Sequence, residues 1–94
     1  MMRWVIAYDI PDDRRRLRVA NILQGFGDRV QHSVFEAVLE DRDRQVLEDE
    51  LGGVIVPQED RLRMYPLCSA CARAVTDLGL VPQPPFAEPD VIIV

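Results

Sequence analysis

The hydrophobic and polar positions change their period several times along the chain, and each change marks the boundary of an expected element. The first apolar run, residues 4–8, is continuous and ends at Asp9. Such a run is typical of a strand that is covered on both faces and therefore lies in the centre of its sheet. Pro11 cannot continue a strand ladder, so a turn is expected there. Asp9 is thus predicted at the carboxyl end of a buried central strand.

Helical spacing replaces the continuous run after this turn. Asp12 and Asp13 can cap free backbone N–H groups and complement the helix dipole, so a helix is predicted from about 13 to 25. Its buried stripe, at helical spacing, consists of Val19, Ile22, Leu23 and Phe26. The glycines at 25 and 27 supply the stop.

Extended structure and a second helix are predicted next. Residues 29–39 are rich in β-branched and aromatic side chains, which indicates two short strands, 29–32 and 34–39, joined by a tight turn near Ser33. A helix over about 43–51 follows, with Asp43 as its cap and a glycine pair at its end.

The last third of the chain contains a strand, a short helix and a proline-rich connector. Alternation over 60–67 predicts a half-exposed strand with arginines on one face, and residues 68–79 are predicted to form a short helix ended by a glycine. Prolines at 82, 84, 85 and 89 make the next stretch an extended connector. The final four residues, 91–94, are apolar and β-branched, so they need a partner strand.

The order β-α-β-β-α-β with an added strand is that of an α+β, ferredoxin-like sandwich. We expect residues 1–80 to form this domain and residues 81–94 to form the connector and a C-terminal dimerisation strand. That strand can return to its own sheet or pair with the other protomer of a homodimer.

Length and composition narrow the class of protein. A chain of 94 residues with 48% hydrophobic and 29% charged residues is one small globular domain rather than a disordered protein. So short a chain buries little of its surface, which favours oligomerisation. No apolar run approaches a membrane span, and the apolar start is too short for a signal peptide, so no membrane contact and a cytoplasmic location are expected.

Charge is distributed unevenly along the chain. The net charge of −5 argues against a generally basic nucleic-acid-binding protein. Residues 1–35, however, hold six arginines against four acids, whereas the remainder holds five arginines against twelve acids. All eleven basic residues are arginine, whose planar guanidinium suits phosphates, although genome composition is the favoured explanation for the absence of lysine.

The two cysteines, Cys68 and Cys71, form a single C-x-x-C. One pair supplies half of a four-ligand zinc site, and a disulfide is not expected in a reducing cytosol. Three interpretations remain: a four-cysteine metal site shared across a dimer, a redox pair, or two small packed residues, of which packing is favoured.

The strongest chemical signal is Asp9 at a strand end, followed at once by an arginine-rich helix start. Open α/β folds place ligands beyond the carboxyl ends of strands. Helical spacing directs Arg15 and Arg16 over the sheet end near Asp9 and places Arg14 and Arg18 on the outer face, where they can grip phosphates. In the competing interpretation, which the residues alone favour, the acids merely cap the helix and the arginines form ion pairs.

A single carboxylate binds Mg²⁺ poorly, because this ion requires octahedral coordination by oxygen ligands. Asp9 alone is therefore short of ligands, but a two-fold dimer could bring two copies together. A metal held there would activate water and stabilise the departing oxygen of a phosphodiester.

Four segments together resemble the CRISPR-associated Cas2 family, over nearly the whole chain. They are YDIPDDRRR at 8–16, RVQHSVFE at 29–36, RLRMYPLC at 61–68 and VIIV at 91–94. The first two segments are specific in combination, whereas either alone would be weak.

The resemblance implies a ferredoxin-like homodimer that works with the Cas1 integrase in spacer acquisition. It implies Asp9 of each protomer as catalytic residue and Mg²⁺ ligand at the dimer interface of a nuclease acting on single-stranded RNA or double-stranded DNA. Phosphate contacts are implied for Arg16, Arg18 and Arg29, to which the helix geometry adds Arg14. Tyr8, Ser33 and Phe35 are implied as lining the site or setting the fold; for Ser33 and Phe35 the second role is favoured.

Three hypotheses follow, and the first is favoured. The protein is a DNA-binding adaptor that joins the integrase, or a Mg²⁺-dependent phosphodiesterase with paired Asp9 carboxylates, or a toxin-like nuclease or regulatory domain outside any CRISPR system. The first two are compatible with each other. The gene neighbourhood separates the third from them.

Overall fold

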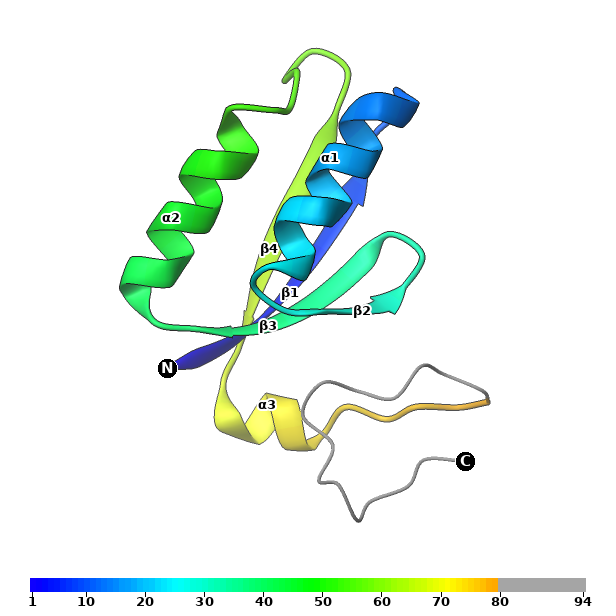
Figure 1. The fold of residues 1–94 in the computed structure, drawn as a ribbon. Helices are drawn as coiled ribbons and strands as arrows, with labels where there is room; N and C mark the ends of the chain where they lie inside the picture. The colour runs from blue at the N-terminus through cyan, green and yellow to red at the C-terminus, as the bar shows by residue number, and fades with distance from the viewer. Residues whose placement is uncertain (80–94) are drawn as a thin grey trace.

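The computed structural model describes residues 1–79, in which seven elements follow one another (Figure 1). They are β1 (Met2–Asp9), α1 (Asp13–Gln24), β2 (Asp28–Gln31), β3 (Val34–Leu39), α2 (Asp41–Gly52), β4 (Arg61–Leu67) and α3 (Ser69–Arg73). The strands form one antiparallel sheet in the order β2-β3-β1-β4. This is the predicted ferredoxin-like arrangement, with β1 in a central position as expected.

Both long helices lie on the same face of the sheet (Figure 1). The core between them is formed by alternate strand residues and helix residues, and its largest fully buried side chains are Phe35, Ile6, Leu23, Leu47 and Val19. On the opposite face of β1, Val5 and Ala7 are only half-buried. The prediction that β1 is covered on both faces is therefore wrong for the described residues, because neither long helix packs there.

Helix α1 begins and ends where its caps predict. The Asp12 side chain accepts a hydrogen bond from the Arg15 backbone N–H at 2.9 Å, and Gly25 follows the last helical residue. Val19 and Leu23 of the expected stripe are buried, whereas Ile22 and Phe26 pack against the core from partly exposed positions. The helix therefore lays one narrow apolar stripe on the sheet.

Gly27 does more than end the helix. A Cβ at this position would lie 2.1 Å from the carbonyl oxygen of Glu36 and 2.7 Å from the Cβ of Ala37. The chain between α1 and β2 thus passes directly against β3, and only glycine leaves room for that approach.

Helix α2 starts two residues earlier than predicted. Asp43 was expected to cap it, but the N-cap is Glu40, whose backbone N–H donates to the Asp43 carboxylate at 3.5 Å. Asp43 thus reaches back from the third helical position, as in a capping box, and the helix begins before it.

Two predictions about residues 68–79 are wrong. Helix α3 stops at Arg73, and no residue of this short helix is buried, so no apolar face holds a longer helix in place. Cys68 and Cys71 are both exposed, which contradicts the interpretation of a packed pair. The expected proline connector and the strand 91–94 lie outside the described residues.

Candidate active site and nucleic-acid interface

Asp9 is the last residue of β1, and its side chain is exposed. In the register between β1 and β4 its Cα partner is Arg61, and the preceding residue on the same face, Ala7, pairs with Arg63. Asp9, both arginines and Tyr65 line an open hollow of about 750 Å³. The strand end therefore presents one carboxylate beside two cations, an arrangement suited to a phosphate with a bridging cation.

Residues 1–79 of one chain do not complete a metal site around this carboxylate. Asp60 lines the same hollow, but both of its oxygens accept hydrogen bonds from Arg15. Among residues 1–79 no group of three histidine, cysteine or acidic side chains is placed to hold a metal ion. Mg²⁺ usually takes one or two carboxylates together with waters and substrate phosphates, so Asp9 fits as one ligand of such a site and not as the whole of it.

Arg15 and Asp60 form a partly buried ion pair that the sequence analysis does not predict. Arg15 Nε and Nη2 donate to the two oxygens of Asp60 at 2.8 and 3.0 Å, and the backbone N–H of Val56 donates to the same carboxylate at 2.8 Å. The hydrogen bonds from Arg15 hold the pKa of Asp60 below its usual 3.8. Arg15 thus reaches the loop before β4 instead of hanging over Asp9, and no local pattern could reveal a contact between residues 45 positions apart.

Arg16 lies at the sheet end, as its helical position predicts. Its Nη1 donates to the carbonyl oxygen of Ile10 at 2.8 Å, and its Nη2 forms an ion pair with Asp13. The Arg16 guanidinium therefore stabilises the turn that follows Asp9. Its role as a phosphate contact stays a prediction.

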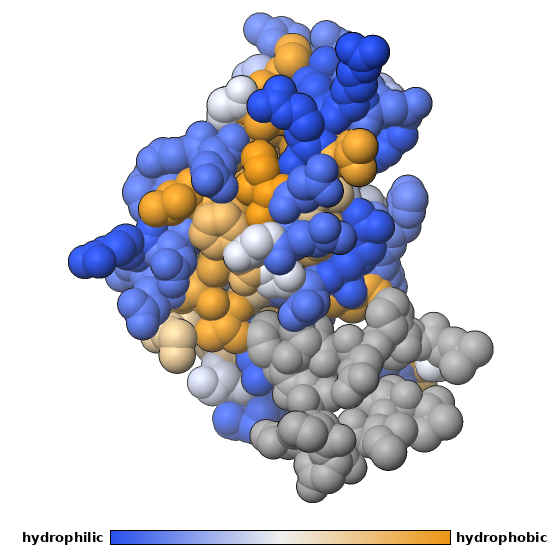
Figure 2. Space-filling model, viewed as in Figure 1, coloured by the Kyte–Doolittle hydropathy of each residue, from blue (hydrophilic) through white to orange (hydrophobic). Residues whose placement is uncertain are grey.

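Arg14 and Arg18 project from the outer surface of α1, one helical turn apart. Both side chains are exposed, and neither forms an ion pair with another residue of the described part of the chain. Figure 2 shows a broad hydrophilic surface over α1, beside an apolar strip that runs between the two long helices. Both arginines are therefore accessible from solvent, and their role as phosphate contacts stays a prediction.

Arg29, in β2, is also exposed, but it has a partner. Its guanidinium lies 5.2 Å from the centroid of the Phe35 ring. Such a cation–π contact orients the side chain and leaves its outward N–H groups available. Arg29 is thus held in place next to the core, while its contact with phosphate remains a prediction.

The three residues implied as lining the site have different surroundings. Phe35 is fully buried and Tyr8 nearly so, and their rings stack with centroids 6.3 Å apart. The carbonyl oxygen of Ser33, in the turn between β2 and β3, accepts the backbone N–H of Tyr8 at 3.1 Å. The fold-setting role favoured for Phe35 is therefore consistent with its position, and Ser33 ties its turn to the strand end next to Asp9.

Fold and site together define a small ferredoxin-like domain whose central strand ends in an exposed carboxylate beside an arginine-bearing helix. The family model described as CRISPR associated protein Cas2 matches residues 2–75. The chain belongs to this family, as its sequence segments predict.

Relatives and solved structures agree with this assignment. CRISPR-associated endoribonuclease Cas2 4 of Rhodospirillum rubrum is 44% identical over 93 residues, which are 99% of this chain and 75% of that protein. The crystal structure of Streptococcus pyogenes Cas2 matches with a TM-score of 0.75 at 29% identity, covering 83% of this chain and all of the other. A chain of a partial Cas6-RT-Cas1–Cas2 complex matches with a TM-score of 0.74 at 28% identity, over 94% of this chain and 99% of that one.

None of the helices within residues 1–79 has both the length and the apolar character needed to cross a bilayer. The cytoplasmic location stays a prediction.

Proposed function

We propose that the protein is a CRISPR adaptation protein, a homodimeric bridge that binds nucleic acid through its phosphates and joins the Cas1 integrase for spacer acquisition. The observation that carries this proposal is the pair of exposed arginines on α1, Arg14 and Arg18, without ion-pair partners in residues 1–79. Paired copies of such a helix offer a longer row of phosphate contacts than one copy. The likeness to a chain of a complex that contains Cas1 supports the choice of partner.

The homodimer is supported by the surface opposite the helices. On that side, Val38 of β3 is 36% exposed and Tyr65 of β4 is 44% exposed. Val5 and Ala7, in the strand β1 between β3 and β4, are half-buried. Apolar side chains on a sheet face that neither long helix covers, next to the charged Arg61 and Arg63, are a natural surface for a second copy of the chain. The apolar residues 91–94 supply a further strand for the same assembly in this proposal.

A second function, compatible with the first, is Mg²⁺-dependent hydrolysis of a phosphodiester in RNA or DNA. It is favoured by the exposed Asp9 beside Arg61 and by the name endoribonuclease that a 44% identical relative carries. In this proposal Asp9 of each protomer provides one metal ligand at the dimer interface. Bound Mg²⁺ would supply charge stabilisation and an activated water, while Arg61 and Arg63 hold the substrate phosphate.

A reconstituted integration assay with Cas1 tests the bridge. The variant Asp9→Asn should still support integration of a spacer duplex, because bridging needs the arginine surface and not the carboxylate. Asp28→Asn, another exposed acid at a strand end, serves as the matched control. Loss of integration in Asp9→Asn alone would contradict a purely structural role for this protein.

Cleavage assays test the hydrolase. The dimeric wild-type protein should cut single-stranded RNA or duplex DNA when Mg²⁺ is added, and Asp9→Asn should lose that activity while Asp28→Asn keeps it. A folded, dimeric preparation that cuts neither substrate with any divalent ion would remove this function.

A further inference from the structure

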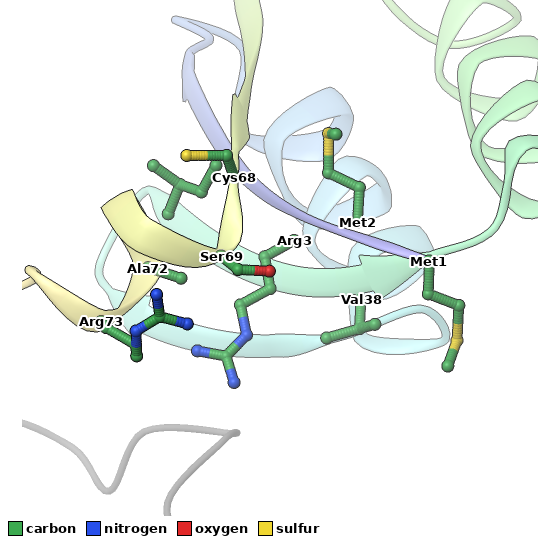
Figure 3. A pocket seen from close by; sticks show the side chains of 9 residues that line it. Met1, Met2, Arg3, Val38, Cys68, Ser69, Ala72 and Arg73 are labelled. Carbon is green, nitrogen blue, oxygen red and sulfur yellow. The ribbon is translucent and has the colours of Figure 1, made fainter.

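The exposed cysteine pair lies where the chain leaves β4 and enters α3. Cys68 is the N-cap of α3, and its carbonyl oxygen accepts the backbone N–H of Ala72 at 2.8 Å. Cys71 therefore sits within the same closed turn. Figure 3 shows Cys68 at this junction, at the edge of a hollow of about 480 Å³ that Arg3 and Arg73 also line.

The two cysteines face each other across this turn. The backbone N–H of Cys71 donates to Cys68 Sγ at 3.4 Å, so the Cys68 sulfur already lies next to Cys71, the residue with which it would form a disulfide. A disulfide spans Cα atoms about 4.4–6.8 Å apart, a range that includes one turn of helix. Closing a bond between the two sulfurs therefore requires side-chain rotation and little movement of the backbone.

The two thiols are also chemically unequal. The hydrogen bonds from the Cys71 N–H and thiol lower the pKa of Cys68, whereas the hydrogen bond to Cys68 raises the pKa of Cys71. The thiolate is the nucleophile in disulfide exchange. Cys68 is thus suited to attack first and Cys71 to act second.

A metal site explains this pair less well. Structural zinc takes four ligands, and no third histidine, cysteine or acidic side chain joins the two cysteines within residues 1–79. Exposure of both thiols leaves them accessible to small molecules instead.

We propose that Cys68 and Cys71 form a reversible intramolecular disulfide by exchange with a low-molecular-weight disulfide, with Cys68 as the attacking thiol and Cys71 as the resolving one. This modification site is independent of the proposed nucleic-acid and integrase functions. When closed, the bond locks the turn through which the chain passes from β4 to the residues after α3.

The exchange balances in two steps. The Cys68 thiolate attacks one sulfur of the small disulfide, joins to that half, and releases the other half as a thiolate that takes a proton from water. Cys71 then gives its proton to solvent, its sulfur attacks Cys68 Sγ, and the second half leaves as a thiol. Two electrons pass from the cysteine pair to the small disulfide, which departs as two thiols.

Glutathione buffers applied to the full-length protein test the proposal. After equilibration from fully reduced to fully oxidised glutathione, samples are quenched in acid, and the free thiols are alkylated and counted by intact mass. We expect both thiols to disappear together, with a mass loss of two hydrogen atoms per chain that a dithiol reductant reverses. The Cys71→Ser variant should instead accumulate one glutathione adduct on Cys68, and Cys68→Ser should form its adduct more slowly.

A variant with the same number of cysteines but a different spacing is the matched control. The double change Cys71→Ser with Ser69→Cys places the two thiols next to each other in the sequence, where they no longer face across a turn. It should collect glutathione adducts and form no internal bond. An internal bond in this control as readily as in the wild type would overturn the geometric argument.

Three further results would overturn the proposal. The first is two free thiols at the most oxidising ratio, in protein whose circular dichroism spectrum is native. The second is loss of the thiols through a bond between two chains, visible as a doubled mass without reductant. The third is stoichiometric Zn²⁺ binding that protects both thiols from alkylation, which would assign the pair to a metal site.

Discussion

Asp60 is fully buried beneath Arg15, and the two side chains join the start of α1 to the residue that precedes β4 through a bidentate ion pair. The next residue, Arg61, is the strand partner of Asp9. The pair therefore positions the start of β4, and with it the two arginines of the hollow, beside the candidate carboxylate.

Replacing Asp60 tests how much of the fold depends on this pair. Asp60→Asn removes the carboxylate charge that Arg15 binds through two hydrogen bonds, and the Arg15 side chain is only 21% exposed. Breaking a buried pair by removing one partner is strongly destabilising, so the melting temperature should fall by roughly 10 °C in thermal unfolding. Glu59→Gln is the control, because Glu59 is 61% exposed and 3.7 Å from Arg15. Equal melting temperatures for both variants would show that the pair contributes nothing.

The same pair predicts a pH dependence with a defined sign. The pKa of Asp60 is lower in the folded protein than the 3.8 of the unfolded chain, so its ionised form stabilises the fold above pH 3.8. This stabilisation is lost as the pH falls through the lower folded value. Melting temperatures measured from pH 7 downward should therefore converge for the wild type and Asp60→Asn below pH 3.8. A gap that stays constant into strong acid would assign the effect to packing.

Glu36 should show the opposite sign. Burial, followed by repulsion from Asp77, raises the pKa of this carboxyl above 4.5, so its charge costs stability, and that cost sets in as the pH rises past 4.5. Glu36→Gln removes the charge and should raise the melting temperature at pH 7 by a few degrees, about 2–5 °C. The exposed Glu50→Gln is the control and should change little. Lower stability of Glu36→Gln at pH 7 would contradict this account.

Alanine substitutions at Gly27 and Gly52 test the close approach of Gly27 to β3, with Gly52 as the control. Gly27→Ala forces a methyl group against the Glu36 carbonyl, which should cost about 1–3 kcal/mol of unfolding free energy in chemical denaturation. Gly52→Ala, with nothing within 4 Å of the new Cβ, should instead gain up to about 1 kcal/mol. If both changes stabilised the protein, β3 would have to lie further from Gly27 than the structure places it.

Salt dependence tests the phosphate contacts of α1. Arg14→Gln and Arg18→Gln should each weaken binding to duplexes of any sequence and reduce the slope of log affinity against log salt by about 1. Fluorescence anisotropy across a salt series measures both effects. Arg42→Gln, at an exposed position of α2, is the control and should leave the slope unchanged. Equal slopes of log affinity against log salt for all three variants would show that α1 does not contact the phosphates.

Local pattern was sufficient for most elements and for the position of Asp9. The cap of α1, the glycines after it and the alternation in β4 act within a few residues, so their consequences are visible in the sequence. The errors lie where a neighbouring surface decides. Helix α3 is shorter than predicted because none of its residues is buried, and β1 is covered on one face because both long helices pack on the other.

The order of elements, the place of the strand-end acid and the arginine-rich start of the first helix could be predicted from the sequence, because these depend on contacts between near neighbours. Which arginines are available to a ligand depends instead on how the helix packs on the sheet. Arg15 is held by Asp60 across 45 positions, whereas Arg14, its neighbour in sequence, points to solvent. The physical reason is that a buried carboxylate binds whichever cation the packing of the helix on the sheet brings within reach.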